Sequence, residues 1–193
     1  MALDLITARL TLRPLTSADV TAAHALWTDP DVRRYLWNNE VVSLDRVREV
    51  IAASTSDFAV KSYGLWGVYD TATGAFAGFA GGREWPEGGP ELMYGLAPAW
   101  WGRGLATEAA DAVIAHLFDT LGHPHVMAAT DPPNQASVQV MERLGNKVEA
   151  RAQRVVRLDG RPARGPLRGH RPRDGGRAEA PAGPRGGPVE PLR

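Results

Sequence analysis

Residues 94–113, YGLAPAWWGRGLATEAADAV, decide which fold this chain is expected to adopt. A half-apolar run reaches two tryptophans and then turns on Gly-Arg-Gly at residues 102–104. From Leu105 onward the apolar residues recur at the spacing of one helix face. The stretch therefore predicts a strand, a glycine turn, and a helix that begins directly after the turn.

A glycine turn of this kind leaves free backbone N–H groups at the positive end of the helix dipole, where a phosphate or pyrophosphate binds. A side chain at Gly102 or Gly104 would keep a ligand away from the backbone, and Arg103 can add a charge-assisted contact. A plain sharp connection is the alternative. A Walker loop is excluded because Leu-Ala-Thr follows the glycines, and the dinucleotide fingerprint does not fit a strand that belongs to a meander.

The sequence on both sides predicts a mixed α/β fold with the element order β-α-α-β-β-β-α-β-α. Residues 5–15 alternate apolar and polar side chains and predict one opening strand. Thr16, Ser43 and Asn134 stand where helix N-caps are expected. Further strands are expected at residues 62–70, 74–85, 91–98 and 123–130, and residues 151–160 could form one more strand.

The composition limits the possible classes of protein. The chain has 193 residues, which is room for one domain, or for one domain and a tail. It contains no cysteine, which excludes disulfides, a thiolate zinc site and a cysteine nucleophile. This composition fits a reducing cytoplasm, where we expect the protein to lie. No signal peptide or membrane-spanning run is recognised, so no membrane partner is expected.

The sequence changes character after residue 160, and a domain boundary is expected there. Residues 1–150 carry 11 Lys and Arg against 18 Asp and Glu, whereas residues 151–193 carry 11 against 4. Residues 161–193 consist mostly of Arg, Gly, Pro and Ala, a composition typical of disorder. A GC-rich gene read out of frame yields such a run, which is our preferred hypothesis. A basic arm for RNA is the alternative, and nucleic acid is not expected as a partner.

Three stretches, in this order, resemble the GNAT N-acetyltransferase superfamily, specifically its RimJ/RimL-like branch of ribosomal-protein N-terminal acetyltransferases. They are LITARLTLRPLTSAD, ELMYGLAPAWWGRGLATEA and NQASVQVMERLG, at residues 5–19, 91–109 and 134–145. The resemblance covers roughly residues 5–160, expected to form the catalytic domain. It implies a mixed, mostly antiparallel sheet flanked by helices, with acetyl-CoA as cosubstrate and no metal. The last strand of the family is not visible after Arg161, so we expect it to be missing or altered.

The resemblance also implies where acetyl-CoA binds. The strand at residues 94–97 would splay from the strand at 125–130, and the pantetheine arm would lie in that gap. The thioester carbonyl would meet the backbone N–H of Leu96, a one-donor oxyanion site. The residues expected to contact acetyl-CoA are Leu96, Ala97, Gly102, Arg103, Gly104, Leu105, Ala106, Thr107, Asn134 and Ser137.

The transfer chemistry needs a neutral amine, a polarised carbonyl and a stabilised thiolate. Many relatives place a tyrosine where this chain has Met141, which cannot donate a proton. The resemblance therefore assigns Ser137, one turn earlier, as the acid or thiolate stabiliser, beside its plain reading as a serine in the first turn of a capped helix. Glu91 is assigned as the base, acting directly or through a water. Glu108 is explained by stabilisation of the helix dipole.

The acceptor side is expected near three aromatic residues, Trp37, Trp85 and Tyr94. The acceptor is a primary amine, either a protein N-terminal α-amine or a small molecule, attacking directly in a ternary complex. The protein is expected to be a monomer or a homodimer. Two rival functions stay open: a catalytically impaired acyl-CoA-binding domain, favoured by Met141 and Met93, and a nucleotide-binding module that uses the glycine turn.

Overall fold

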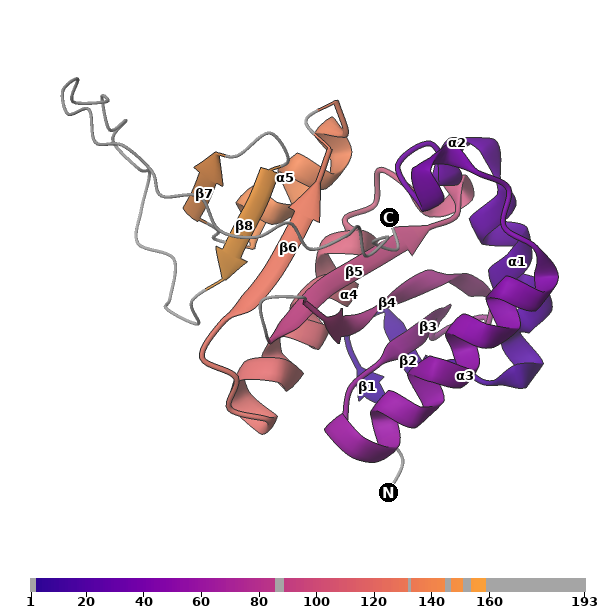
Figure 1. Ribbon diagram of the computed structural model, residues 1–193, viewed down its shortest axis with the longest axis horizontal. Coiled ribbons are helices and arrows are strands. Elements are labelled where there is room, and N and C mark those ends of the chain that lie inside the picture. Colours follow the sequence, from indigo (N-terminus) through magenta and orange to yellow (C-terminus); the bar gives the residue numbers. More distant parts are fainter. Residues whose placement is uncertain (1–2, 86–88, 132, 145–146, 151–153, 159–193) are drawn as a thin grey trace, which may run out of the picture.

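The computed structural model describes residues 3–85, 89–131, 133–144, 147–150 and 154–158. They form one eight-stranded sheet in the order β1-β2-β3-β4-β5-β6-β8-β7, with helices on both faces (Figure 1). The strands are β1 (Leu5–Ile6), β2 (Leu10–Pro14), β3 (Leu65–Asp70), β4 (Phe76–Glu84), β5 (Pro90–Leu96), β6 (Val126–Thr130), β7 (Lys147–Ala150) and β8 (Arg154–Leu158). The helices are α1 (Val20–Thr28), α2 (Pro30–Arg33), α3 (Leu44–Lys61), α4 (Leu105–Ala115) and α5 (Gln135–Arg143).

The sheet is mixed and mostly antiparallel, as expected from the sequence. Every paired neighbour is antiparallel except β5 and β6, which run parallel because α4 crosses over between them. Helices α1 and α3 lie on one face, and α4 lies on the other (Figure 1). α5 shares a hydrophobic cluster with α4. This arrangement puts the start of α4 and the start of α5 near the end of β5, where the site is built.

Local signals account for most of the element boundaries. The Thr16 hydroxyl accepts from the Ala18 N–H, and Asp19 completes the expected capping box. Ser43 accepts from the Arg46 N–H at the start of α3. The apolar stripe of α4 is buried as predicted, with Leu105, Ala109 and Val113 all nearly inaccessible to solvent. The helix predicted from Leu105 onward is α-helical to Ala115 and continues as a π-helical turn over His116–Thr120.

The predicted single strand at residues 5–15 is wrong. The structure has two strands, β1 and β2, paired antiparallel with Leu5 opposite Leu12. The turn between them is held by Thr7, whose N–H donates to the Leu10 carbonyl and whose hydroxyl accepts from the Leu10 N–H, both at 2.9 Å. Apolar alternation continues on both sides of this turn, so the pattern alone cannot reveal it.

The sequence also predicted too few strands after α5. One strand was expected within residues 151–160, but the structure has β7 and β8, an antiparallel hairpin. β8 lies between β6 and β7, with Val126 opposite Leu158. The expected loss of the family's last strand concerns the sequence after Arg161. Those residues, and the expected tail at 161–193, lie outside the described part of the chain.

Candidate active site

β5 and β6 separate after two paired residues. Their parallel register joins Glu91 to Met127 and Leu92 to Ala128, and no later pair is formed within the described residues. β5 nevertheless continues to Leu96. The strands therefore open into a gap between sheet neighbours, as the family resemblance implied.

The backbone of β5 turns polar groups into this gap. Ala97 donates its N–H to the Ala77 carbonyl on the β4 side, at 2.9 Å. Because antiparallel pairing alternates along a strand, Leu96 and Tyr94 present their N–H and C=O groups on the opposite side, toward β6. The N–H of Leu96 thus faces the gap as predicted. The N–H of Tyr94 is a second donor that the sequence reasoning missed, although the period-two alternation of a strand was the signal for it.

Two details restrict what this end of β5 can bind. The Leu96 carbonyl accepts a hydrogen bond of 2.6 Å from the indole N–H of Trp101. The N–H of Ala97 is used within the sheet, and its carbonyl accepts from the Trp100 N–H at 2.9 Å. Ala97 was predicted to contact the cosubstrate, but both of its backbone groups already have partners. A contact from Ala97 would have to come from its methyl group or from the second lone pair of its carbonyl.

The glycine turn has the geometry of an anion site. Gly102 and Gly104 both have φ of +74°, a left-handed conformation that favours glycine. The first helical hydrogen bond runs from the Glu108 N–H to the Gly104 carbonyl, at 3.1 Å. Among the described residues, the N–H groups of 102–107 have no acceptor. A methyl group added at Gly102 would meet nothing within 4 Å, so the backbone is open to a ligand there. Charge, shape and free donors therefore fit a pyrophosphate.

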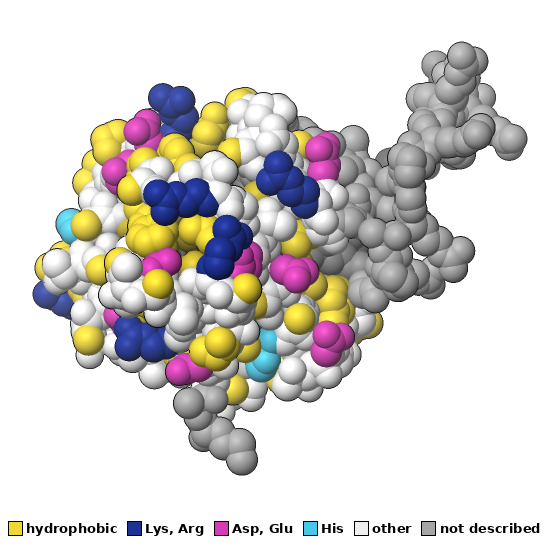
Figure 2. All heavy atoms as spheres, turned by 180° about the vertical axis from the view of Figure 1, so that it is seen from behind, with side chains coloured by type: hydrophobic (Ala, Val, Ile, Leu, Met, Phe, Trp, Pro, Cys, Tyr) yellow, Lys and Arg dark blue, Asp and Glu magenta, His cyan; other side chains and the backbone are white. Residues whose placement is uncertain are grey.

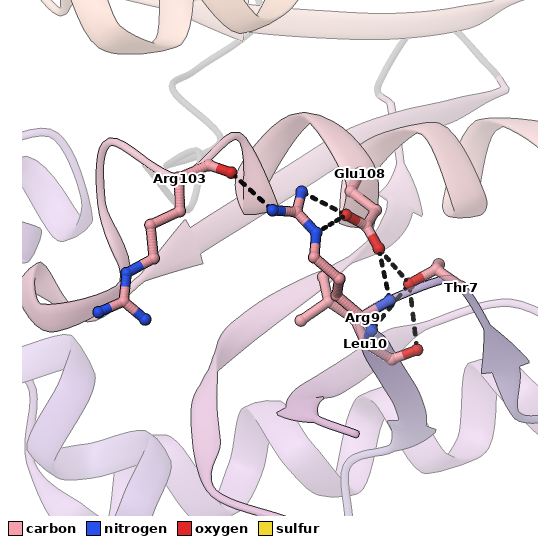
Figure 3. Close-up of polar contacts among 5 residues, drawn as sticks. All are labelled: Thr7, Arg9, Leu10, Arg103 and Glu108. Atoms are coloured by element: carbon pink, nitrogen blue, oxygen red, sulfur yellow. Dashed lines mark hydrogen bonds and ion pairs between the residues drawn. The ribbon is translucent and has the colours of Figure 1, made fainter. Parts of the chain in front are cut away.

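An ionic cluster anchors the loop from behind (Figure 3). One Glu108 carboxylate oxygen accepts from the Thr7 hydroxyl at 2.6 Å and from the Arg9 N–H at 2.9 Å. The other accepts from Arg9 Nε at 2.7 Å and lies 2.5 Å from Arg9 Nη2. Arg9 Nη1 also donates to the Arg103 carbonyl, at 3.0 Å. Arg9 thus joins the β1–β2 turn to both the loop and the first turn of α4.

The cluster explains more than the helix-dipole role predicted for Glu108. Burial alone would raise the pKa of Glu108, but hydrogen bonds from Thr7 and Arg9 outweigh it and leave the pKa below its ordinary value. The Arg103 side chain points away from Glu108 (Figure 3), and its guanidinium carbon lies 5.4 Å from the centre of the Trp100 ring. Arg103 therefore remains available to a ligand at the exposed side of the loop.

Ser137 and Tyr94 meet across the gap. Asn134 caps α5 by accepting from the Ser137 N–H at 3.2 Å, which is the predicted capping role. The Ser137 hydroxyl lies 2.8 Å from the Tyr94 hydroxyl, which is also 3.3 Å from the Ser137 carbonyl. Burial raises the pKa of Tyr94 to about 12, against a smaller lowering by Ser137. The phenol is therefore protonated at neutral pH. Met141, one turn later, is buried in the core.

Glu91 lies on the opposite face of β5 from Tyr94. Glu91 is 5% exposed, and its carboxylate lies 2.5 Å from Nε of Arg83, which stands opposite it on β4. Glu91 precedes Leu96 by five residues, which is about 16 Å along a strand, and precedes Tyr94 by about 10 Å. A direct proton transfer from an amine held at Leu96 is out of reach for Glu91, so any role as a base requires intervening water.

The predicted acceptor residues are not brought together. Trp37 lines a cavity of about 150 Å³ on the face that carries α1 and α3. Trp85 is not among the residues that line this cavity. The backbone N–H of Trp85 donates to the Gly89 carbonyl at 2.8 Å, at the turn between β4 and β5. Tyr94 points to the α4 side and reaches Ser137 instead. These three residues therefore lie in three different surroundings.

The outer surface carries charged side chains of both signs. On the face seen in Figure 2, basic and acidic side chains are interspersed around an apolar area, and the coloured residues form no continuous basic surface. Within the described residues, no helix is long and apolar enough to cross a membrane. The same residues contain no group of three His, Asp or Glu side chains placed to hold a metal ion.

Comparison with known proteins identifies this arrangement. Residues 9–147 match the family model described as the acetyltransferase (GNAT) domain. YkkB from Bacillus subtilis, an uncharacterised protein, is 32% identical over 147 residues, covering 73% of this chain and 83% of YkkB. YoaA from the same organism, an uncharacterised N-acetyltransferase, is 25% identical and covers 81% of this chain and 89% of its own length.

Solved structures agree with the sequence match. An acetyltransferase from Agrobacterium tumefaciens is 28% identical with a TM-score of 0.71, covering 80% of this chain and 93% of that one. RimL, a ribosomal α-N-protein acetyltransferase solved with CoA, shares the fold at 16% identity with a TM-score of 0.70, covering 81% of this chain and 97% of that one. The chain therefore belongs to the GNAT acetyltransferase family, whose members use acetyl-CoA to acetylate an amine.

Proposed function

We propose that this chain transfers acetyl from acetyl-CoA to a primary amine by direct attack in a ternary complex. The observation that carries the proposal is the conjunction, at one end of β5, of the open N–H groups of residues 102–107 and the gap-facing N–H groups of Tyr94 and Leu96. Because the chain has no cysteine, a cysteinyl acetyl-enzyme is excluded, which favours direct transfer.

Bound acetyl-CoA would supply the activated acetyl group, and the chain's own residues would hold it. The loop N–H groups would bind the pyrophosphate, with Arg103 adding a contact from the exposed side. Asn134 and the end of β5 would flank the pantetheine arm in the gap. The N–H of Leu96, or that of Tyr94 one alternation earlier, would donate to the thioester oxygen, where negative charge develops in the transition state.

Ser137 and Tyr94 are proposed to act together in protonating the departing thiolate. The Ser137 hydroxyl is the donor assigned to the departing sulfur, and the Tyr94 phenol at 2.8 Å can return a proton to it. The raised pKa of Tyr94, about 12, keeps this second proton in place at neutral pH. Tyr94 thereby provides from β5 a phenol that Met141 does not provide from α5.

Glu91 remains the proposed base, acting through water. Its carboxylate lies 2.5 Å from Arg83 Nε, which fixes its position on β5. Because Glu91 lies about 10 Å along the strand from Tyr94 and on the opposite face of β5, this role requires a chain of waters that passes through the gap between β5 and β6. Arg83 is then the positioning residue that holds the Glu91 carboxylate on the face of β5 that also carries Met93.

The acceptor is proposed to be a protein N-terminal α-amine or a small primary amine, following the RimJ/RimL-like branch. One observation favours a second candidate, a binding domain without turnover. Met141 is 2% exposed and packs in the core, so the usual donor position holds no donor. Turnover then depends on Ser137, which is the residue to test.

The first experiment is a thermal shift with acetyl-CoA, with ATP and NAD as controls. CoA release is then measured with a library of N-terminal peptides and a panel of small amines. We expect stabilisation by acetyl-CoA alone and turnover with at least one amine class. Stabilisation without any turnover would support the binding domain, whereas stabilisation by ATP or NAD instead would overturn the assignment of the loop.

We further propose that the catalytic domain spans residues 1–160 and that 161–193 is not part of it. The family match ends at residue 147, and the composition changes after residue 160. Sequencing the gene in independent isolates tests the out-of-frame hypothesis. An intact reading frame in every isolate would contradict it.

A further inference from the structure

Trp101 directly precedes the glycine turn, and burial does not account for it. Trp101 is 49% exposed and belongs to neither hydrophobic cluster of the described residues. Its neighbour Trp100, by contrast, packs against the cluster that contains the apolar stripe of α4. A half-exposed ring gains only part of the free energy of burial, so a polar contact is the distinguishing feature of Trp101. That contact is the hydrogen bond of 2.6 Å from its indole N–H to the Leu96 carbonyl.

The Leu96 carbonyl needs a donor from outside the sheet. It faces the gap, where β5 forms no pair with β6 after Leu92 in the described chain. Leu96 is 4% exposed, so its carbonyl has little access to water. A buried carbonyl without a donor costs free energy comparable to a lost hydrogen bond, and the indole N–H of Trp101 removes that cost. Because a donor lies beyond the oxygen that it binds, the edge of the indole lies on the gap side of Leu96.

The indole bond closes the connection between the two halves of the proposed site. β5 ends at Leu96, and the glycine turn begins at residue 102. Between them, residues 97–101 form a tight turn in which the Trp101 backbone N–H donates to the Pro98 carbonyl at 3.1 Å. Proline also restricts the backbone there. The indole then bonds the last residue of this connection back to the end of β5, so the glycine turn cannot move away from the strand without breaking that bond.

The opposite side of the glycine turn is held by a separate contact. Arg9 Nη1 donates to the Arg103 carbonyl at 3.0 Å, and Arg9 is bonded in turn to Glu108 on α4 (Figure 3). Of these two contacts, the one from Trp101 is made to β5 and so fixes the position of the turn relative to the gap. Loss of the indole N–H should therefore leave the turn attached to α4 and change its separation from the strand.

We propose that Trp101 is a positioning residue for the cosubstrate: its indole N–H holds the glycine turn at a fixed separation from the gap-facing N–H groups of Tyr94 and Leu96. A molecule that binds the turn and the strand together gains from this fixed separation, because its second contact is intramolecular once the first has formed. The inference rests on the proposed function, which takes the turn and the gap to hold the pyrophosphate and the thioester of one molecule.

Two variants separate the donor from the ring. Trp101→Phe keeps an aromatic ring and loses the N–H. Trp101→Gln loses the ring and keeps an N–H donor, as many bonds from Cβ as the indole nitrogen. Trp100→Phe is the matched control, since it makes the same change one residue earlier and leaves the bond to Leu96 in place. Calorimetric displacement gives the Kd of CoA and of 3′-phospho-ADP, which keeps the pyrophosphate and lacks the pantetheine arm.

Only the ligand with the arm should respond to the loss of the indole N–H. One neutral hydrogen bond corresponds to roughly three- to tenfold in affinity, so Trp101→Phe should raise the Kd of CoA by that factor. The Kd of 3′-phospho-ADP should stay within about twofold of the native value, because this ligand contacts the glycine turn and not the strand. In Trp101→Gln and Trp100→Phe, the Kd of CoA should also stay within about twofold of the native value.

Three results would overturn the proposal. An equal loss of affinity for CoA and for 3′-phospho-ADP in Trp101→Phe would show that the indole supports the conformation of the turn and not its separation from β5. A native affinity for CoA in Trp101→Phe would show that the bond does not contribute to binding. The same loss in Trp101→Gln or Trp100→Phe as in Trp101→Phe would assign the effect to the aromatic rings.

These binding measurements need no turnover, which separates the inference from the proposed function. If the Kd of CoA responds as expected and no amine is acetylated, Trp101 keeps its role and only the proposed function fails. If amines are acetylated and CoA binds Trp101→Phe as tightly as the native chain, the function stands and the role of Trp101 is refuted. A native chain that binds no CoA would refute both.

Discussion

Replacing Gly102 with alanine separates backbone strain from ligand contact. Gly102 has φ of +74°, and a methyl group added there would meet nothing within 4 Å. Gly74, in the β3–β4 turn, has φ of +72° and equally open surroundings. Gly102→Ala and Gly74→Ala should therefore carry the same strain, about 1–2 kcal/mol for a non-glycine residue in this conformation. Both should lower Tm by about 2–8 °C.

Only Gly102→Ala should weaken acetyl-CoA binding. The added methyl group would separate the pyrophosphate from one or two loop N–H groups. A hydrogen bond to a charged group contributes about 1.5–3 kcal/mol, so Kd should rise roughly 10- to 100-fold. At a ligand concentration of 100 times the native Kd, acetyl-CoA stabilises the native chain by about 2.7 kcal/mol, and a tenfold weaker variant by about 1.4 kcal/mol.

Calorimetric titration gives the affinities, and thermal unfolding with and without acetyl-CoA gives the linked stabilisation. Gly74→Ala should show the native affinity despite its lower Tm. Native affinity in Gly102→Ala would refute the assignment of the loop. An equal loss of affinity in both variants would show that strain, rather than contact, decides binding.

The remaining predictions concern the anchor of the loop and the reacting groups. Glu108→Gln should destabilise the protein by about 2 kcal/mol at pH 7, and the exposed-pair control Glu49→Gln by under about 0.5 kcal/mol. Since the folded pKa of Glu108 is lowered, its stabilisation is present above the ordinary value of 4.5 and is lost as pH falls through the folded pKa, so urea unfolding at pH 7 and pH 4 should show the difference shrinking. A constant difference would contradict this. Ser137→Ala should lower kcat about 100-fold and leave KM for acetyl-CoA within threefold of the native value. Tyr94→Phe should lower kcat by a smaller factor. An unchanged steady-state kcat in Ser137→Ala would refute Ser137 as the acid. Glu91→Gln should lower the rate of acetyl transfer at neutral pH. A pH–rate profile of this variant that equals that of the native chain from pH 6 to 9 would exclude Glu91 as the base.

Local sequence signals predicted the frame of the site. The strand, glycine turn and helix of residues 94–113 follow from short-range patterns, since period-two and period-3.6 apolar spacing and the left-handed preference of glycine are properties of adjacent residues. The same holds for Asn134 as the cap of α5, whose acceptor lies three residues along. These signals also sufficed for the family resemblance, which the match over residues 9–147 confirms.

Strand pairing joins residues that are not neighbours in the sequence, and the predictions of strand number were wrong at both ends of the sheet. A turn at Thr7 divides one alternating stretch into β1 and β2, because a side-chain hydrogen bond replaces a backbone one at a place that apolar spacing does not mark. β7 and β8 form a hairpin that inserts β8 next to β6. Strand order depends on which edges remain unpaired after folding, and a one-dimensional pattern does not contain that information.

By itself the sequence determined the fold class, the glycine loop and the family. The tertiary structure alone decided which groups meet: Arg9 with Glu108 across 99 positions, Tyr94 with Ser137 across 43, and the rings of Trp27 and Trp37, whose centroids lie 5.3 Å apart. The physical reason is that a side chain's propensity depends on its immediate neighbours. A hydrogen bond or a cavity depends instead on how distant elements pack, and burial fixes that packing only when the whole sheet has formed.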